Sequence, residues 1–79
     1  MYVYILKSNI NNRYYIGCTN NLERRLKDHN SGRNVSTKNG APWVIIYYEE
    51  IENPKEAYGR ERQIKSYKGG NAFKKLLSL

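Results

Sequence analysis

The sequence predicts an α+β domain with the element order strand, strand, helix, strand, helix, helix. Three segments are rich in the β-branched and aromatic residues that favour strands: 2–7, 13–19 and 43–48. Cap-forming residues precede three segments that we expect to be helical: 22–31, 54–67 and a short one from 71. Chains usually divide only well beyond this length, so we expect one domain over residues 1–79.

The first two predicted strands are separated by a cluster of turn-forming residues, 8–12, and we expect them to pair as an antiparallel hairpin. Side chains alternate between the two faces of a strand. Tyr4 therefore shares a face with Leu6, and Tyr15 shares a face with Gly17. The two tyrosines of the paired strands are expected to come together.

The first predicted helix starts after Asn20 or Asn21 and ends before Gly32, a residue type that often terminates helices. Arg25 and His29 lie four residues apart, so both project to one side of this helix. The segment 33–42 that follows is polar and is expected to be a loop able to contact a ligand.

The uninterrupted apolar run at 43–48 predicts a strand covered on both faces, in a sheet between helices. The second helix has Asn53 as its cap and Pro54 at its first position. Within it, Glu61 follows the helical period of the apolar residues, so its carboxylate is expected on the side that faces the sheet. Asn71 is expected to cap the last short helix.

Composition restricts the function. Fourteen Lys and Arg against seven Asp and Glu give a net charge of +7, which favours a nucleic-acid partner over a basic surface kept only for solubility. A single cysteine, Cys18, and a single histidine, His29, exclude an internal disulfide and a Cys/His zinc site. The sequence has neither a membrane-span-length apolar run nor a secretion leader, so we expect a cytoplasmic protein.

Each candidate residue has a structural alternative when it is taken alone. The Glu61 carboxylate either pairs with Arg60, Arg62 or another basic side chain, or lies at the edge of the apolar stripe and reaches water, or has a metal-binding or catalytic role. Arg25 and His29 are either solvated at the helix edge or bind a ligand. The tyrosines either pack or catalyse, and Cys18 is expected to be a small buried hydrophobic side chain rather than a nucleophile.

The order and spacing of these residues resemble the GIY-YIG nuclease family. The resemblance is carried by Val3-Tyr4, Tyr15-Ile16-Gly17, Arg25 ten residues after Tyr15, His29, Glu61 with Gln63-Ile64-Lys65 after it, and Asn71. It covers nearly the whole chain and implies a three-stranded antiparallel sheet flanked by helices. Two positions depart from the family pattern: no glycine heads the Tyr2-Val3-Tyr4 motif, and Cys18 stands where many members carry a basic residue.

The resemblance implies a stand-alone endonuclease similar to the nuclease domain of the excision-repair incision subunit, and so DNA as the partner and DNA repair as the setting. It implies one Mg²⁺ or Mn²⁺ held by Glu61, a scissile phosphate bound by Arg25, and Tyr4 and Tyr15 on the attacking side. Resemblance leaves open which tyrosine is the base, and we favour Tyr15. The remaining implied roles are an assisting His29 and supporting or DNA-binding positions at Lys65 and Asn71.

Two other classes of function fit the same composition. One is a nucleic-acid-binding module with the same fold and no turnover, in which tyrosines stack on bases. The other is a small interaction domain whose charge serves a protein partner. A carboxylate turned inward at Glu61 favours the enzyme, because binding alone does not need it. A protein partner that supplies specificity is also compatible with so small a domain.

Overall fold

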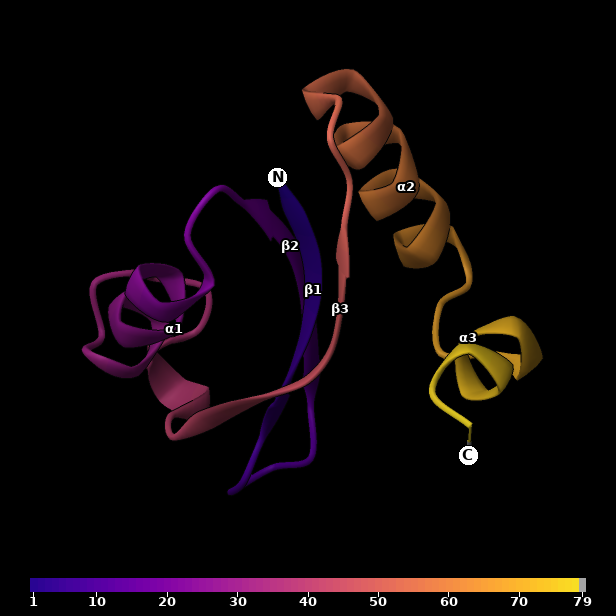
Figure 1. Cartoon of the computed structure of the whole chain (residues 1–79). Coiled ribbons are helices and arrows are strands. Elements are labelled where there is room, and N and C mark those ends of the chain that lie inside the picture. Colours follow the sequence, from indigo (N-terminus) through magenta and orange to yellow (C-terminus); the bar gives the residue numbers. More distant parts are fainter. Residues whose placement is uncertain (79) are drawn as a thin grey trace.

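The computed structural model describes residues 1–78 and confirms the predicted order of elements. The strands are β1 (Tyr2–Ser8), β2 (Tyr14–Thr19) and β3 (Trp43–Glu50). The helices are α1 (Leu22–Asn30), a single 3-10 turn η1 (Lys38–Gly40), α2 (Pro54–Ser66) and α3 (Asn71–Leu76). Figure 1 shows the sheet between two helical layers, with α1 on one side and α2 and α3 on the other.

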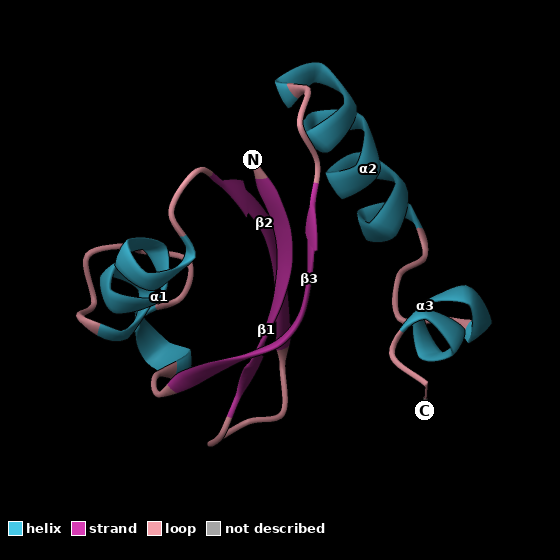
Figure 2. Ribbon diagram, viewed as in Figure 1, coloured by secondary structure: helices cyan, strands magenta, loops and turns pink. Residues whose placement is uncertain are grey.

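The three strands form one antiparallel sheet in the order β2-β1-β3, so β1 is central and the other two are edges. β1 carries side chains buried on both faces because both faces are covered. Val3 and Ile5 pack with Ala57, Ile64 and Phe73 in the layer of α2 and α3. Tyr4 and Leu6 pack with Trp43 and the leucines of α1 on the other face. Figure 2 shows this division into layers.

The expectation that β3 is covered on both faces is wrong. In β3 covered and exposed residues alternate, and Val44, Ile46 and Tyr48 are exposed. An edge strand needs less covering than a central one, and the most deeply buried strand is β1. The register of β3 also shifts opposite Ile5 and Leu6, so that Ile45 packs on the α1 face while Tyr47 packs on the α2 face.

The helix boundaries follow the predicted caps with one exception. The Asn21 side chain accepts a hydrogen bond from the backbone N–H of Arg24, and the Asn53 side chain accepts one from Lys55, so each satisfies an N–H group that the first turn leaves free. Gly32 has a φ of +81°, the left-handed conformation expected after a helix end. The exception is α3, whose cap is Gly70, while Asn71 is the first helical residue.

Two polar side chains fasten the segment between α1 and β3 to the sheet. The Asn30 side chain donates to the carbonyl of Trp43 at 3.1 Å and accepts from its N–H at 2.6 Å, which ties the end of α1 to the start of β3. Ser8 at the end of β1 donates to the carbonyl of Gly40 at 2.6 Å. The segment predicted as a loop is therefore partly built into the fold, and Thr37 and Gly40 within it are buried.

Candidate active site

Tyr4 and Gly17 are directly paired on β1 and β2, and the phenol ring of Tyr4 lies against the glycine. A Cβ at residue 17 would lie 2.6 Å from Cζ of Tyr4, closer than side-chain atoms approach one another. The glycine of the Tyr15-Ile16-Gly17 motif therefore leaves space for the ring of Tyr4. The same pairing brings the rings of Tyr4 and Tyr15 to 6.4 Å between centroids, as the sequence predicts.

His29 is fully buried under these tyrosines rather than at the edge of the helix. Its ring centroid lies 4.7 Å from that of Tyr15, and its Nε2 lies 3.0 Å from the Tyr4 hydroxyl. On the other side of the ring, Nδ1 lies 2.7 Å from the hydroxyl of Thr37. Burial, and secondarily the charge of Arg25, lower the pKa of His29, so the ring is neutral at neutral pH.

Arg25 lies one turn before His29 on α1 and donates from Nε to the Tyr4 hydroxyl at 3.4 Å. This hydrogen bond is the main reason why the pKa of Arg25 is raised, and Tyr15 adds to the effect. Burial raises the pKa of Tyr4, while the hydrogen bond from Arg25 opposes that increase. Tyr4, Tyr15, Arg25 and His29 thus form one group, which we call the tyrosine cluster.

Arg25 is the member of the tyrosine cluster that lines a hollow of about 300 Å³ at the open β2 edge of the sheet. Arg25 and Asp28 of α1 line one side of it, and Cys18 lies on the strand. Tyr58, an α2 residue whose side chain is 53% exposed, lines the side formed by the other helical layer. Side chains from both faces of the sheet therefore meet at this edge, and we call this space the arginine hollow.

Glu61 belongs to a second hollow of about 310 Å³, which shares Tyr58 with the arginine hollow and is also lined by Arg62 and Lys65. We call it the glutamate hollow. Because α1 and α2 cover opposite faces of the sheet, Glu61 and Arg25 approach from opposite sides of the β2 edge. The carboxylate of Glu61 is close enough for its charge to contribute to the raised pKa of both Tyr4 and Cys18.

Glu61 is paired with Lys65, whose Nζ lies 2.6 Å from Oε2. The Glu61 side chain is 20% exposed, so it lies at the margin of the apolar stripe rather than under it. The sequence raised the alternative that Glu61 pairs with a basic side chain. Such an ion pair is present, and the partner is Lys65. Arg60, another basic residue of α2, instead makes a bidentate ion pair with Glu49 of β3 at 2.8 to 3.1 Å.

The two remaining residues singled out by the sequence lie apart from the tyrosine cluster. Asn71 is exposed at the start of α3, and none of the hydrogen bonds within residues 1–78 joins its side chain to the cluster. Cys18 packs against the apolar core on the α2 face, whereas His29 is buried on the α1 face. Burial raises the pKa of the Cys18 thiol, which favours the protonated form over a nucleophilic thiolate.

Thr37 contacts the tyrosine cluster, but nothing in the sequence marks it as a candidate site residue. It is 1% exposed and bonded to His29, yet it stands in a polar segment with no periodicity or motif around it. A threonine eight residues after a histidine carries no signal by itself. Only the folding of 34–40 behind α1 brings the two side chains together.

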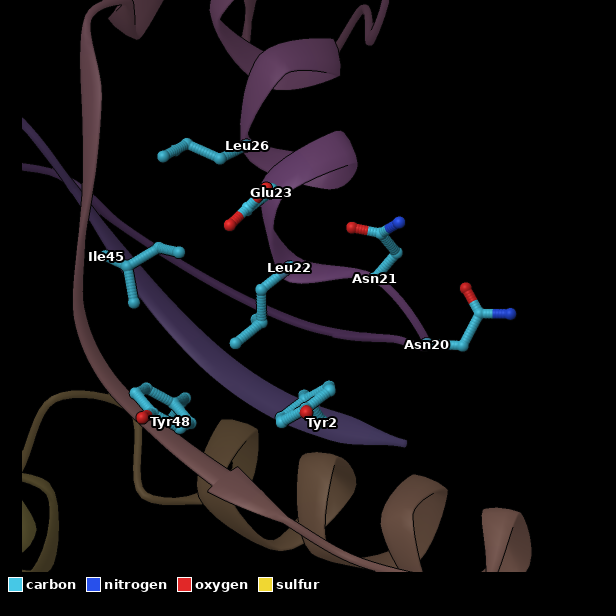
Figure 3. Close-up of a pocket in the computed structure, with 8 residues that line it drawn as sticks. All are labelled: Tyr2, Asn20, Asn21, Leu22, Glu23, Leu26, Ile45 and Tyr48. Atoms are coloured by element: carbon cyan, nitrogen blue, oxygen red, sulfur yellow. The ribbon is translucent and has the colours of Figure 1, made fainter.

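A further hollow of about 430 Å³ lies on the α1 face between the helix and β3 (Figure 3). Leu22 and Leu26 of α1, Ile45 and Tyr48 of β3, and Tyr2 of β1 make its lining largely apolar. It contains none of the residues of the tyrosine cluster.

Among the described residues, no helix combines the length and the apolar composition that a membrane span requires.

The sheet order, the paired tyrosines and the helix that carries Arg25 and His29 can be compared with known domain families. Residues 1–74 match the GIY-YIG catalytic domain. The chain therefore belongs to the GIY-YIG family, whose domain supports a nuclease-type function.

Among curated proteins, the chain is similar to small proteins named UPF0213. It is 46% identical to one from Clostridium perfringens over 65 residues, which cover 81% of this chain and 69% of the relative. It is 40% identical to one from Staphylococcus haemolyticus over 67 residues, which cover 84% of this chain and 80% of the relative. A relative from Haloquadratum walsbyi is 34% identical over 84% of this chain and 74% of its own length. No solved structure matches this chain significantly.

Proposed function

We propose that this chain is a divalent-metal-dependent DNA endonuclease in which Arg25 binds the scissile phosphate and Glu61 holds the metal. One observation carries the proposal: the arginine hollow and the glutamate hollow adjoin at Tyr58, at the open edge of the sheet. Arg25, a cation that can bind phosphate, and Glu61, a carboxylate that can bind a metal, can thus both face the same stretch of DNA backbone. Family membership supplies the reaction class, phosphodiester cleavage.

Arg25 fits the role of phosphate ligand on chemical grounds. Negative charge gathers on the non-bridging oxygens of the phosphate in the transition state, and a planar guanidinium meets two of them at once. The bond to Tyr4 uses Nε, and that bond fixes the plane of the group. Lysine has no such fork, so it is expected to bind the phosphate without orienting it.

Glu61 fits a metal site with one protein ligand. No group of three or more His, Cys, Asp and Glu side chains gathers anywhere in residues 1–78. Mg²⁺ keeps several waters and is often held by one carboxylate together with substrate phosphate, so a partly exposed glutamate beside an open hollow suffices. Once bound, the ion supplies charge stabilisation at the phosphate oxygens. Lys65, which pairs with Glu61 in this structure, would then be free to bind a DNA phosphate.

The two tyrosines are suited to different tasks. Tyr4 is 2% exposed and bonded to both His29 and Arg25, so it orients the arginine from inside the fold. Tyr15 is only half-buried. A general base must reach the attacking water, which favours Tyr15 for that role.

The surroundings of the two hollows suit a polyanion. Tyr58 presents an exposed ring between the hollows, where a base can stack, and Arg62 and Lys65 stand beside it on α2. Phosphate contacts of this kind make binding weaken steeply with salt. We also propose a cytoplasmic protein that acts in DNA repair, with a protein partner supplying the specificity that so small a binding surface does not encode.

One observation favours a second candidate function. The ion pair between Lys65 and Glu61 neutralises the carboxylate without a metal. A nucleic-acid-binding module without turnover would need no metal at this position. The two functions differ in what Glu61 is for. In the enzyme its carboxylate is needed for cleavage, whereas in the binding module its removal leaves every measurable activity in place.

A cleavage assay separates the two functions. Labelled plain, flapped and branched DNA duplexes are incubated with the protein and Mg²⁺ or Mn²⁺, and DNA affinity is measured in parallel. We expect nicking by the wild type, and loss of nicking with retained affinity in Glu61→Gln. The control is Glu56→Gln, which removes an exposed carboxylate from the same helix. DNA binding with no nicking of any substrate would contradict the proposed function.

A further inference from the structure

Thr37 lies at the inner end of a row of hydrogen bonds that begins at Arg25. From the hollow inwards, the row joins Arg25 Nε to the Tyr4 hydroxyl at 3.4 Å and the Tyr4 hydroxyl to His29 Nε2 at 3.0 Å. His29 Nδ1 is then joined to the Thr37 hydroxyl at 2.7 Å. Tyr4, His29 and Thr37 are each at most 2% exposed, so their side chains are shielded from bulk solvent.

Only one direction of donation satisfies this row. Arg25 can only donate, so the Tyr4 oxygen accepts from it and the Tyr4 proton must go elsewhere. The acceptor within reach is Nε2 of His29, which must therefore carry a lone pair. A neutral imidazole with a free Nε2 carries its proton on Nδ1, and that proton is donated to Thr37.

The opposite direction leaves a buried group without a partner. If Thr37 donated to Nδ1, the ring proton would sit on Nε2 and point at the Tyr4 oxygen. The Tyr4 oxygen would then face two N–H groups, and its own proton would have no acceptor among the described residues. An unsatisfied buried hydroxyl lowers the population of such an arrangement by roughly fivefold to 150-fold, a penalty that the first direction avoids.

The position of Thr37 is itself fixed by the fold. Its N–H donates to the carbonyl of Asn34 at 3.1 Å, and its carbonyl accepts from the indole Nε1 of Trp43 at 2.7 Å. Its hydroxyl has the same Asn34 carbonyl within donating distance, at 3.4 Å. With its own proton given to Asn34, the threonine oxygen is free to accept from His29 Nδ1, 2.7 Å away.

We propose that Thr37 is a positioning residue that sets the ring tautomer of His29 and, through the Tyr4 hydroxyl, the orientation of Arg25. Thr37 does not line the arginine hollow. The segment 34–40 would thus influence Arg25 indirectly, through His29 and Tyr4. The consequence for DNA cleavage rests on the proposed function, whereas the tautomer and the orientation of Arg25 belong to the protein alone.

The single histidine makes the first test direct, because every imidazole ¹⁵N signal belongs to His29. At pH 7.5 we expect a protonated Nδ1 and an unprotonated Nε2 in the wild type and in Thr37→Ser. In Thr37→Val, which keeps the shape and removes the acceptor, either tautomer leaves one buried donor unpaired, so we expect part of the population to carry the proton on Nε2. A protonated Nε2 in the wild type, or an unchanged tautomer in Thr37→Val, would overturn the proposal.

The second test follows Arg25 itself. Its Nε–H signal is identified by its loss in Arg25→Ala, and we expect it to shift in Thr37→Val. It should stay in place in Ser36→Ala, which removes an exposed neighbouring hydroxyl that bonds only within its own turn. An unmoved Arg25 signal in Thr37→Val would refute the link between the two residues.

Cleavage provides a third readout that separates this inference from the proposed function. If the chain is an endonuclease, Thr37→Val should cut about tenfold more slowly at saturating DNA, and Thr37→Ser should restore the rate. If no variant cuts DNA, the proposed function fails, while the two spectroscopic results still decide the role of Thr37. Cleavage by Thr37→Val at the wild-type rate would contradict the inference.

Discussion

Gly17 and Tyr4 are paired across β2 and β1, and the absence of a side chain at Gly17 allows the phenol of Tyr4 to lie across the neighbouring strand. From there its hydroxyl reaches His29 and Arg25. The glycine is thus a packing requirement of the tyrosine cluster. It does not have the positive φ that would demand a glycine for its backbone.

Gly17→Ala is therefore expected to displace the Tyr4 ring and lower stability by about 1 to 3 kcal/mol, the usual cost of overpacking. Cleavage should fall further than the loss of folded protein explains, because Arg25 loses its partner. Gly59→Ala is the matched control: a Cβ there has nothing within 4 Å, and replacing a helical glycine should stabilise by up to about 1 kcal/mol. Chemical denaturation and nicking rates measure both, and a fully active Gly17→Ala would refute this account.

The buried His29 makes stability depend on pH. Its pKa is lowered in the folded state by burial and by Arg25 against the opposing charge of Asp28, while the phenols of Tyr4 and Tyr15 face it from the sheet. The unfolded chain therefore binds more protons, so stability should decrease as pH falls through about 6.5. One proton limits the slope to about 1.4 kcal/mol per pH unit.

Urea denaturation at pH 7.5, 6.5 and 5.5 measures this slope. The decrease should disappear in His29→Gln, since no other histidine titrates in this range. The pKa of Glu49 is lowered chiefly by Arg60, so protonation of Glu49 also lowers the free energy of unfolding, but at more acidic pH. An identical pH dependence in wild type and His29→Gln would show that His29 is not a buried neutral ring.

Arg60 and Arg62 on α2 are expected to differ in role. Arg60 makes bidentate contacts with Glu49, which also bonds Tyr47, and it joins α2 to β3. Arg62 is exposed beside the glutamate hollow. Arg60→Met should lower stability by roughly 1 kcal/mol, since both partners are largely covered, while Arg62→Met should leave stability within about 0.5 kcal/mol. Equal stability of the two variants would contradict this division.

Tyr58 is expected to contact DNA through its ring rather than its hydroxyl. Tyr58→Ala should weaken binding by about 1 to 3 kcal/mol, the usual value of one stacked base, whereas Tyr58→Phe should bind like the wild type. Fluorescence anisotropy with a short labelled flap substrate measures the affinity. The reverse pattern, in which the phenylalanine variant binds as weakly as the alanine variant, would exclude stacking.

The sequence predicts most of the fold because its signals are local. Asn21, Asn53 and Gly32 mark helix ends through hydrogen bonds and backbone conformations within one turn. The wrong expectation for β3 has a different origin. An apolar run does not reveal whether its strand is central, and here the central position belongs to β1, whose neighbours are set by long-range pairing.

The candidate site is predictable to the extent that its residues lie close in sequence or in a motif. Arg25 and His29 share a helix face, and Tyr4 meets Tyr15 through hairpin pairing. The burial of His29 and its bond to Thr37 depend on how the segment 34–40 folds back, which no local pattern encodes. The approach of Glu61 across the β2 edge likewise depends on two helices packing on opposite faces.

The central claim is that Arg25 recognises the scissile phosphate during hydrolysis. The most direct test is single-turnover cleavage of saturating duplex DNA with Mg²⁺ by Arg25→Lys, with Arg13→Lys as a control at an exposed position before β2. Both keep the net charge. We predict a loss of about 100-fold or more in Arg25→Lys with DNA affinity nearly unchanged, and no loss in Arg13→Lys. Cleavage by Arg25→Lys at the wild-type rate would contradict the account.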